Sequence, residues 1–198
     1  MNHAVIFAHP SPHSFTGAVA ETYAATARAL GHAVITRDLY RIGFDPLLRA
    51  SELPWSQPVI VPPDVAAERA MLREIDVFAL VYPFWLNAPP ALMKGYLERV
   101  FGFGFGYGAG GHSYKPLLSG RQLISFSSSG APLAWLQKTG AYDAECTLFG
   151  SYIADLCGMT SIDHVHVGGV VPGASESFVQ ARLEDVKKTV SKYFGKPL

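Results

Sequence analysis

Cysteine is scarce in this chain of 198 residues, which contains only Cys146 and Cys157. Both are expected on one helix, where their spacing corresponds to roughly 16 Å along the helix axis. That separation excludes a disulfide between them, and two thiols are too few for a cysteine-held metal cluster. We therefore expect no metal site and a reducing, cytoplasmic setting.

Charge is also scarce, and long apolar runs are lacking. Charged residues make up 16% of the sequence, and the 16 basic and 16 acidic residues cancel. Nucleic-acid-binding proteins usually carry a basic stripe, and small electron carriers often use a strong charge to reach their partners, so neither class is favoured. No apolar run reaches the ~20 residues of a membrane span, so no membrane insertion is expected.

Short apolar runs alternate with helical patterns along the chain, in which 49% of the residues are hydrophobic. The runs predicted as strands are residues 4–8, 33–39, 76–82, 122–127 and 161–167. The segments predicted as helices are residues 17–30, 64–73, 89–101, 143–157 and 175–194, with an irregular segment at 40–63. We expect one domain spanning residues 1–198.

Five strands separated by helices predict an α/β fold with a parallel sheet covered by helices on both faces. Right-handed crossovers and the length of the chain favour the doubly wound strand order 2-1-3-4-5. Ligands bind such sheets at the carboxyl ends of the strands, near the switch point between strands 1 and 3. The loops after strands 1, 3 and 4 are therefore the candidate site.

The loop after the first strand, residues 9–17, carries two histidines and several hydroxyl groups and leads into a helix. Free backbone N–H groups and the positive end of the helix dipole make a helix start a phosphate site. Ser14 and Thr16 can donate hydrogen bonds to phosphate oxygens. The alternative is that these side chains only cap the helix.

The loop after the third strand, residues 82–90, is rich in apolar and aromatic side chains at a strand end that normally meets solvent. A planar apolar ligand with polar edges would use such a loop, because backbone groups can bind its edge while side chains cover its face. The alternative is a plug of core residues under the next helix.

The loop after the fourth strand, residues 127–132, consists of small residues that permit close approach of the backbone and offer N–H donors. An ordinary polar turn is the alternative for this loop taken alone. The functional interpretation rests on all three loops, which share one edge of the predicted sheet.

Two further patterns are not interpreted as the binding motifs that they match. Gly106, Gly108 and Gly111 match a dinucleotide-binding motif, but they follow a helix instead of a strand and lie in a run of alternating Phe and Gly. We interpret that run as a flexible aromatic loop able to fold over a bound ring. His164 and His166 alternate on a strand and are interpreted as an exposed or hydrogen-bonded pair.

Three segments resemble the NAD(P)H quinone reductases of the DT-diaphorase type, which have a flavodoxin-like fold. His9-Pro10 with residues 14–16 is similar to the phosphate loop of that family, and residues 83–101 are similar to its flavin-ring loop and the following helix. Residues 105–111 resemble its bacterial branch, which includes ancillary reductases of glutathione-regulated potassium efflux systems. The match extends over nearly the whole chain.

The resemblance implies a homodimer with active sites at its interface and bound FAD or FMN, of which His9 favours FAD. It implies ping-pong transfer of a hydride from NAD(P)H through flavin N5 to a quinone or similar acceptor, with docking to a membrane transporter as a further expectation. Carried over by position, the cofactor-binding residues are His9, Ser14, Phe15, Thr16, Pro83, Phe84, Trp85, Leu86, Asn87, Ser127, Ser128, Ser129 and Gly130. Tyr107, Gly108 and Ala109 would contact the substrate.

Two positions depart from the resemblance. The quinone reductases have a tyrosine and a histidine near flavin N1 and O2, and these positions are Trp135 and Ala141 here, with Tyr142 beside the latter. Trp135 and Tyr142 are therefore the candidate catalytic residues. Stabilisation of negative charge would rest on the backbone N–H groups of Ser129 and Gly130, assisted by Tyr142.

Two other functions fit the same residues. One is a broad FMN-dependent reductase or an azo- or nitroreductase. The other is a flavin-binding regulatory subunit with little turnover.

Overall fold

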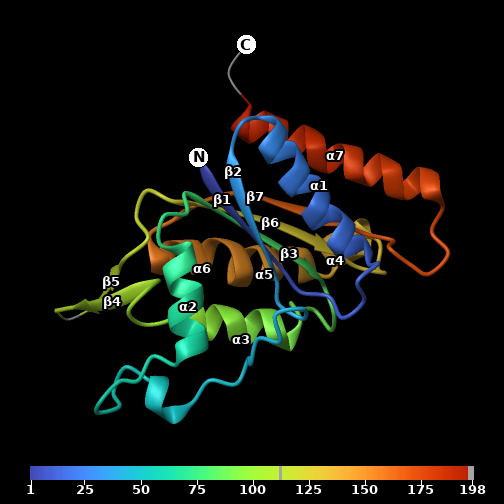
Figure 1. Ribbon diagram of the computed structural model, residues 1–198. Coiled ribbons are helices and arrows are strands. Elements are labelled where there is room, and N and C mark those ends of the chain that lie inside the picture. The colour runs from blue at the N-terminus through green and yellow to red at the C-terminus, as the bar shows by residue number, and fades with distance from the viewer. Residues whose placement is uncertain (112, 196–198) are drawn as a thin grey trace.

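The centre of the molecule is a five-stranded parallel sheet with the strand order β2-β1-β3-β6-β7. The computed structural model describes residues 1–111 and 113–195. The strands are β1 (Asn2–Phe7), β2 (Ala33–Asp38), β3 (Val77–Pro83), β6 (Gln122–Ser128) and β7 (Thr160–Val167). The predicted α/β fold, the five parallel strands and their order are confirmed (Figure 1).

Helices cover both faces of the sheet. On one face lie α1 (Phe15–Ala29) and α7 (Glu176–Phe194), and on the other lie α2 (Pro63–Leu72), α3 (Ala91–Val100) and α6 (Tyr152–Cys157) (Figure 1). Each layer buries its own apolar cluster against the strands. Strand β3 is buried along its whole length, because it lies in the middle of the sheet under both layers.

The segment predicted as one helix over residues 143–157 begins earlier and is not uniform. It consists of α5 (Ala141–Cys146), a π-helical turn η2 (Thr147–Ser151) and α6. A π turn accommodates one more residue than an α turn, and side-chain periodicity over so few residues does not reveal it. Both cysteines are free, as expected.

The strands of a hairpin, a short helix and a 3₁₀ turn were not predicted. Strands β4 (Tyr107–Gly110) and β5 (Ser113–Pro116) form an antiparallel hairpin, so the prediction of a flexible aromatic loop is wrong for residues 107–110. Backbone hydrogen bonds between the two strands stabilise the hairpin. The glycines at alternate positions of β4 have no side chains, so the alternation of apolar and polar residues typical of a strand is absent from the sequence. The short helix α4 (Leu133–Lys138) follows β6, and a 3₁₀ turn η1 (Ala50–Glu52) interrupts the irregular segment.

In the described part of the chain, no helix is both long and apolar enough to cross a membrane.

Candidate cofactor site

A cavity of about 530 Å³ lies at the carboxyl edge of the sheet, where four loops meet. Its volume is in the usual range for small-molecule sites. The lining residues are His9, Ser11, His13, Ser14, Phe15, Thr16, Pro83, Trp85, Ser128, Ser129, Gly130, Val170 and Pro172. The three loops predicted to converge are therefore brought together, and most of the predicted cofactor-binding residues line one cavity.

The start of α1 forms one wall of the cavity. Ser14 is its N-cap, and the Ser14 hydroxyl oxygen accepts a hydrogen bond from the Gly17 N–H at 3.1 Å. The capping interpretation of Ser14 is thus confirmed, although the residue also lines the cavity. Phe15 and Thr16 follow in the first turn, where backbone N–H groups have no partner within the helix. This wall is suited to an anion such as a phosphate.

Pro83 and Trp85 form another part of the lining, and Trp85 begins a tight turn over residues 85–88. The Trp85 N–H donates to the Ala88 carbonyl at 2.9 Å, and the Ala88 N–H donates back to the Trp85 carbonyl at 3.0 Å. The central residues have left-handed backbones, with φ of 49° at Leu86 and 64° at Asn87. Leucine is unfavourable there, and such strain is typical of ligand-binding loops.

The first and third loops are in contact with each other. The rings of His9 and Trp85 lie 5.5 Å apart between centroids. The Ser11 N–H donates to His9 Nδ1 at 3.0 Å, which fixes the orientation of the imidazole. Trp85 nevertheless remains partly exposed, so its indole is available to cover a ring bound in the cavity.

Four of the predicted cofactor-binding residues do not line the cavity. Phe84 and Ser127 are buried beneath it, and the Phe84 ring lies against that of His166 at 5.9 Å. Leu86 and Asn87 are at the exposed tip of the turn. These residues shape the loops rather than line the cavity within one chain.

The loop after β6 offers fewer donors than predicted. The Ser129 N–H donates to the Val167 carbonyl at 3.0 Å, so the prediction that it stabilises a ligand's negative charge is wrong. The bond ties the end of β6 to the end of β7. Within the described residues the Gly130 N–H has no acceptor, and Gly130 lines the cavity.

A buried cluster of polar side chains lies below this loop. The Ser127 hydroxyl oxygen is 2.8 Å from His164 Nε2 and 2.7 Å from His166 Nδ1. His166 Nε2 is in turn 2.8 Å from the Ser129 hydroxyl oxygen. The carboxylate of Glu145 faces both rings, at 3.5 Å from His164 Nε2 and 3.7 Å from His166 Nδ1. The histidines are thus a hydrogen-bonded pair, one of the two alternatives predicted.

The two histidines are held in different protonation states. Burial lowers the pKa of His164, but interactions with Cys146 and Glu145 together outweigh burial and raise it to about 9. Burial lowers the pKa of His166, and the charge of His164 lowers it further, against the opposing effect of Glu145. At neutral pH, His164 is therefore charged and His166 neutral.

The candidate catalytic residues lie outside the cavity lining. Trp135 is on α4 with its side chain exposed. Tyr142 is on α5, its hydroxyl donates to the His164 carbonyl at 2.9 Å, and burial raises its pKa above the ordinary value. Tyr142 therefore faces β7 rather than the cavity, and the catalytic role of either residue stays a prediction.

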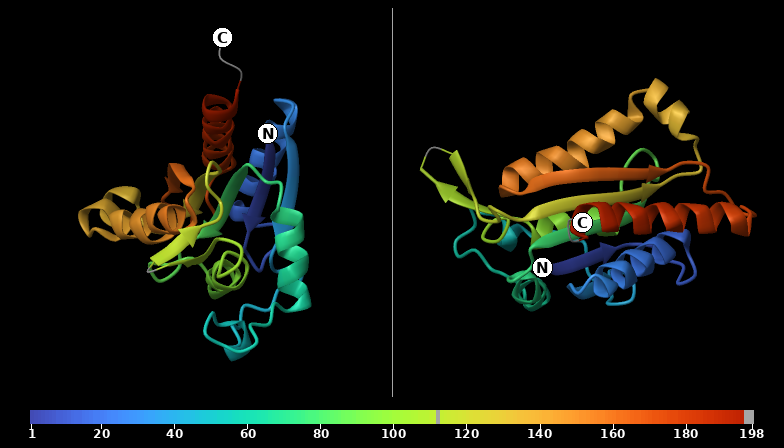
Figure 2. Two further views of the ribbon diagram at one scale, coloured as in Figure 1. Left: turned by 90° about the vertical axis from the view of Figure 1, so that its left-hand side faces the viewer. Right: turned by 90° about the horizontal axis from the view of Figure 1, so that it is seen from above.

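The substrate residues predicted from the aromatic run are not near the cavity within one chain. Tyr107, Gly108 and Ala109 form strand β4, at the end of the sheet opposite the strand arrowheads (Figure 2). Tyr107 lines a second cavity of about 510 Å³, whose walls include Phe101, Leu148 and Tyr152.

Sequence reasoning missed the fourth loop of the cavity, which contributes Val170 and Pro172 after β7. Gly168 allows the chain to pass close to the loop before α4, since a Cβ there would lie 2.5 Å from the Leu133 nitrogen. The rule that all parallel strands end at one edge applies to the fifth strand too, and would have identified this loop.

A doubly wound sheet with a helix start, a strained aromatic turn and a small-residue loop around one cavity defines a flavodoxin-like ligand-binding protein. A family model described as the flavodoxin-like fold matches residues 1–190. An uncharacterised NAD(P)H oxidoreductase of Haemophilus influenzae is 32% identical over 173 residues, covering 86% of this chain and 85% of that protein. The chain belongs to the flavodoxin-like family of NAD(P)H oxidoreductases.

Two further relatives carry more specific names. NAD(P)H dehydrogenase [quinone] 1 of Rattus norvegicus is 26% identical over 64% of this chain, and the match spans about half of that enzyme, 53%. The solved structure of an NAD(P)H:quinone oxidoreductase from Methanothermobacter marburgensis has a TM-score of 0.80 and 25% identity, covering 100% of this chain and 99% of that chain.

Proposed function

We propose that this chain is a flavin-dependent NAD(P)H dehydrogenase of the quinone-reductase type. The observation that carries the proposal is the cavity of about 530 Å³, which is lined both by a helix start and by the aromatic Trp85, next to the switch point between β1 and β3. A flavin nucleotide has a phosphate at one end and a planar ring with polar edges at the other. The cavity walls match these two ends.

The residues divide between the two ends of the cofactor. Phe15 and Thr16, at the start of α1, would hold phosphate through backbone N–H groups and the Thr16 hydroxyl, with His9 and Ser14 beside them. The turn after β3 would hold the ring, with Trp85 against its face. Residues 128–130 would lie along a polar edge of the ring, to which the Gly130 N–H can donate a hydrogen bond.

The flavin, when bound, supplies the chemistry by accepting a hydride from NAD(P)H and passing it on to a quinone or a similar small acceptor. The protein orients both substrates in turn, excludes water and supplies the surrounding electrostatic field. FAD is the favoured nucleotide because of His9 in the phosphate loop, and FMN is the alternative.

A homodimer would complete the site. The cavity beside Tyr107 is lined by mostly apolar side chains of the segment 148–157, of which Leu148 and Tyr152 are exposed, and by Leu97 and the Lys94–Glu98 ion pair of α3. Burying the apolar side chains against a second copy would remove apolar surface from water. The β4–β5 hairpin of one chain would then reach the cofactor cavity of the other, which would give Tyr107 its predicted substrate contact.

Activity with different acceptors tests the proposal. We expect the purified protein to oxidise NADPH or NADH rapidly with menadione as acceptor. Faster turnover with an azo dye or a nitro compound would favour the broader reductase. Intact flavin without turnover would favour a regulatory subunit, such as one that docks to a potassium efflux transporter.

A double substitution tests the placement of the cofactor. Trp85→Asp with Ser14→Asp puts a negative charge at each end of the site, while Asp at the N-cap still allows the helix to form. We expect flavin affinity to fall at least about 100-fold, or about 2.7 kcal/mol. The matched control is Trp55→Asp with Ser175→Asp, an exposed tryptophan and the N-cap of α7, both outside the cavity lining. Equal affinity in the two double variants would contradict the placement.

A further inference from the structure

The buried cluster below the cavity is a hydrogen-bonded chain with a defined direction. The Ser129 hydroxyl donates to the Ala131 carbonyl at 2.9 Å, so it must accept from His166 Nε2–H. His166 Nδ1 is then an acceptor and receives the Ser127 hydroxyl hydrogen, and Ser127 in turn accepts from His164 Nε2–H. The chain therefore extends from the buried His164 to Ser129, which lines the cavity.

Glu145 lies beside this row of hydrogen bonds but takes no part in it. Its side chain is fully buried, and neither carboxylate oxygen has a hydrogen-bond partner within the described residues. A buried carboxylate in this condition is costly unless cations compensate it. One imidazolium, on His164, is present at neutral pH, and His166 lies close enough to Glu145 to be the second.

We propose that His166 takes up a proton from solvent at Nδ1, the ring nitrogen that faces Glu145, when negative charge develops on a cofactor held against residues 128–130. Ser127 then accepts a hydrogen bond from Nδ1–H instead of donating one to Nδ1. The inference rests on the proposed flavin function. With His166 neutral, the charges of Glu145 and His164 cancel. With His166 protonated, the cluster carries one positive charge, which offsets the negative charge in the cavity. The proton comes from bulk water, and no bond in the protein is broken.

Among the described titratable side chains in and around the cluster, His166 is the one that we expect to change its protonation state. Tyr142 faces both imidazoles from α5, and Tyr82 faces His164 from β3, but burial raises the pKa of both phenols. Asp163 accepts the His164 backbone N–H and the Tyr193 hydroxyl. From α7, Arg182 lines a hollow with His166 and pairs with Asp185. Cys146 lies on α5 near His164.

His164, His166 and Glu145 are positioning residues in this scheme, because they act on the cavity through Ser129. A purely structural role predicts altered stability but an unchanged number of protons bound on reduction. A charge-compensating role predicts a change in that number.

The first experiment counts protons. The holoprotein, loaded with the flavin it binds, is reduced by two electrons near pH 7, and proton uptake is measured with an indicator dye. We expect Glu145→Gln and His166→Gln to take up about one proton fewer per flavin than the unaltered protein. Asp163→Asn, which removes a neighbouring carboxylate on β7, is the matched control and should match the unaltered protein. Equal uptake by all four proteins would overturn the inference.

A second measurement requires no substitution. In the holoprotein labelled with ¹³C and ¹⁵N in histidine, NMR reports the protonation of each imidazole. We expect His166 to be neutral in the oxidised protein and protonated after reduction. Unchanged His166 signals would overturn the inference while leaving flavin binding and turnover intact. A protein that binds no flavin would overturn the proposed function and this inference with it.

Discussion

Leu86 is the residue at which the candidate site conflicts most with local backbone preferences. Its φ of 49° costs a leucine on the order of 1 kcal/mol, and its side chain is fully exposed, so no packing offsets that cost. Asparagine tolerates this conformation. We therefore expect Leu86→Asn to raise the free energy of unfolding of the apoprotein by about 1 kcal/mol in urea titrations.

Leu47 provides the control for that substitution. It is also exposed, and its φ is not positive. Leu47→Asn should change stability by less than about 0.5 kcal/mol. If Leu86→Asn destabilises the protein, the left-handed backbone does not describe the turn in solution.

His3 makes stability depend on pH. It is buried at the start of β1, with Nδ1 2.9 Å from the Tyr23 hydroxyl, and burial is the main cause that lowers its pKa from 6.5 to about 4. The unfolded chain therefore binds a proton at a higher pH than the folded one, and stability is lost as pH falls through this interval. We expect the loss to be on the order of 3 kcal/mol.

Urea titrations at several pH values check this expectation. His3→Asn should unfold with a weaker dependence on pH between 6.5 and 4, even if it is less stable throughout. An unchanged dependence would show that other groups are responsible for it.

Single residues were predicted unevenly from the sequence. The sequence could place His9, Ser14, Trp85 and Ser128, because they follow parallel strands and all parallel strands end at the same edge of the sheet. The buried cluster around His164 and His166 could not be predicted, because it also requires Glu145 and Ser127, which are distant in sequence. Only packing brings these four side chains together.

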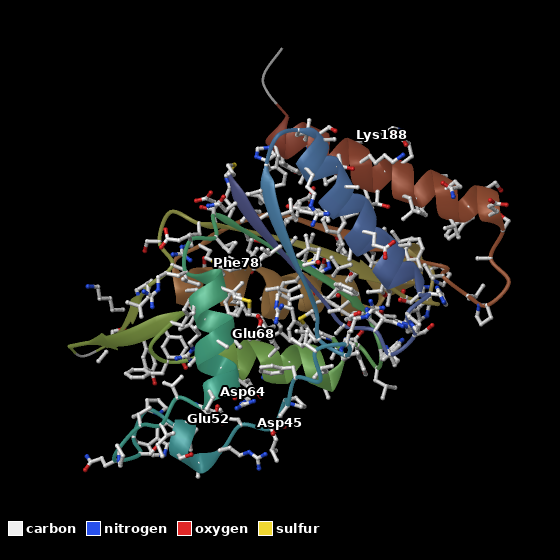
Figure 3. The ribbon with its side chains drawn as sticks, in the orientation of Figure 1. Asp45, Glu52, Asp64, Glu68, Phe78 and Lys188 are labelled. Atoms are coloured by element: carbon white, nitrogen blue, oxygen red, sulfur yellow. The ribbon has the colours of Figure 1, made fainter. Side chains whose placement is uncertain are left out.

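At the scale of elements, one buried ion cluster holds the irregular segment 40–63 against α2 and α3. Arg99 on α3 is almost fully buried, with its Nε 2.9 Å from Glu52 Oε1 and its Nη1 2.7 Å from Asp64 Oδ2. Figure 3 shows Glu52 and Asp64 at the lower end of α2, whose first turn contains Asp64. Arg99→Met would leave the buried Glu52 carboxylate without its cation, which typically costs about 3 kcal/mol.

A double variant separates the charge from the packing. Arg99→Met with Glu52→Gln should recover much of the stability lost in Arg99→Met alone, as measured by urea unfolding. Additive losses in the double variant would contradict a coupled ion pair.

The main elements followed from their patterns, and the exceptions have physical reasons. The five parallel strands are short apolar runs between helices, and such runs stay recognisable when both faces are buried. The β4–β5 hairpin is rich in glycine, and the π turn in 147–151 changes the helix without changing composition. Neither feature produces a periodic signal in the sequence.

For the whole molecule, the proposed dimer is the main expectation. Leu148→Glu with Tyr152→Glu places two charges on the exposed apolar wall beside Tyr107. We expect this variant to be a monomer by sedimentation and to lose most of its reductase activity. Trp55→Glu, at another exposed apolar side chain, should remain a dimer. A dimeric double variant would show that the interface lies elsewhere.

Flavin binding is the most direct test of the whole account, since every functional statement depends on it. The purified protein should be yellow, or, if isolated without cofactor, should bind FAD or FMN in a fluorescence titration at about one per chain. Mass spectrometry of the released chromophore then identifies the nucleotide. A colourless protein that binds neither nucleotide would contradict the assignment of the cavity.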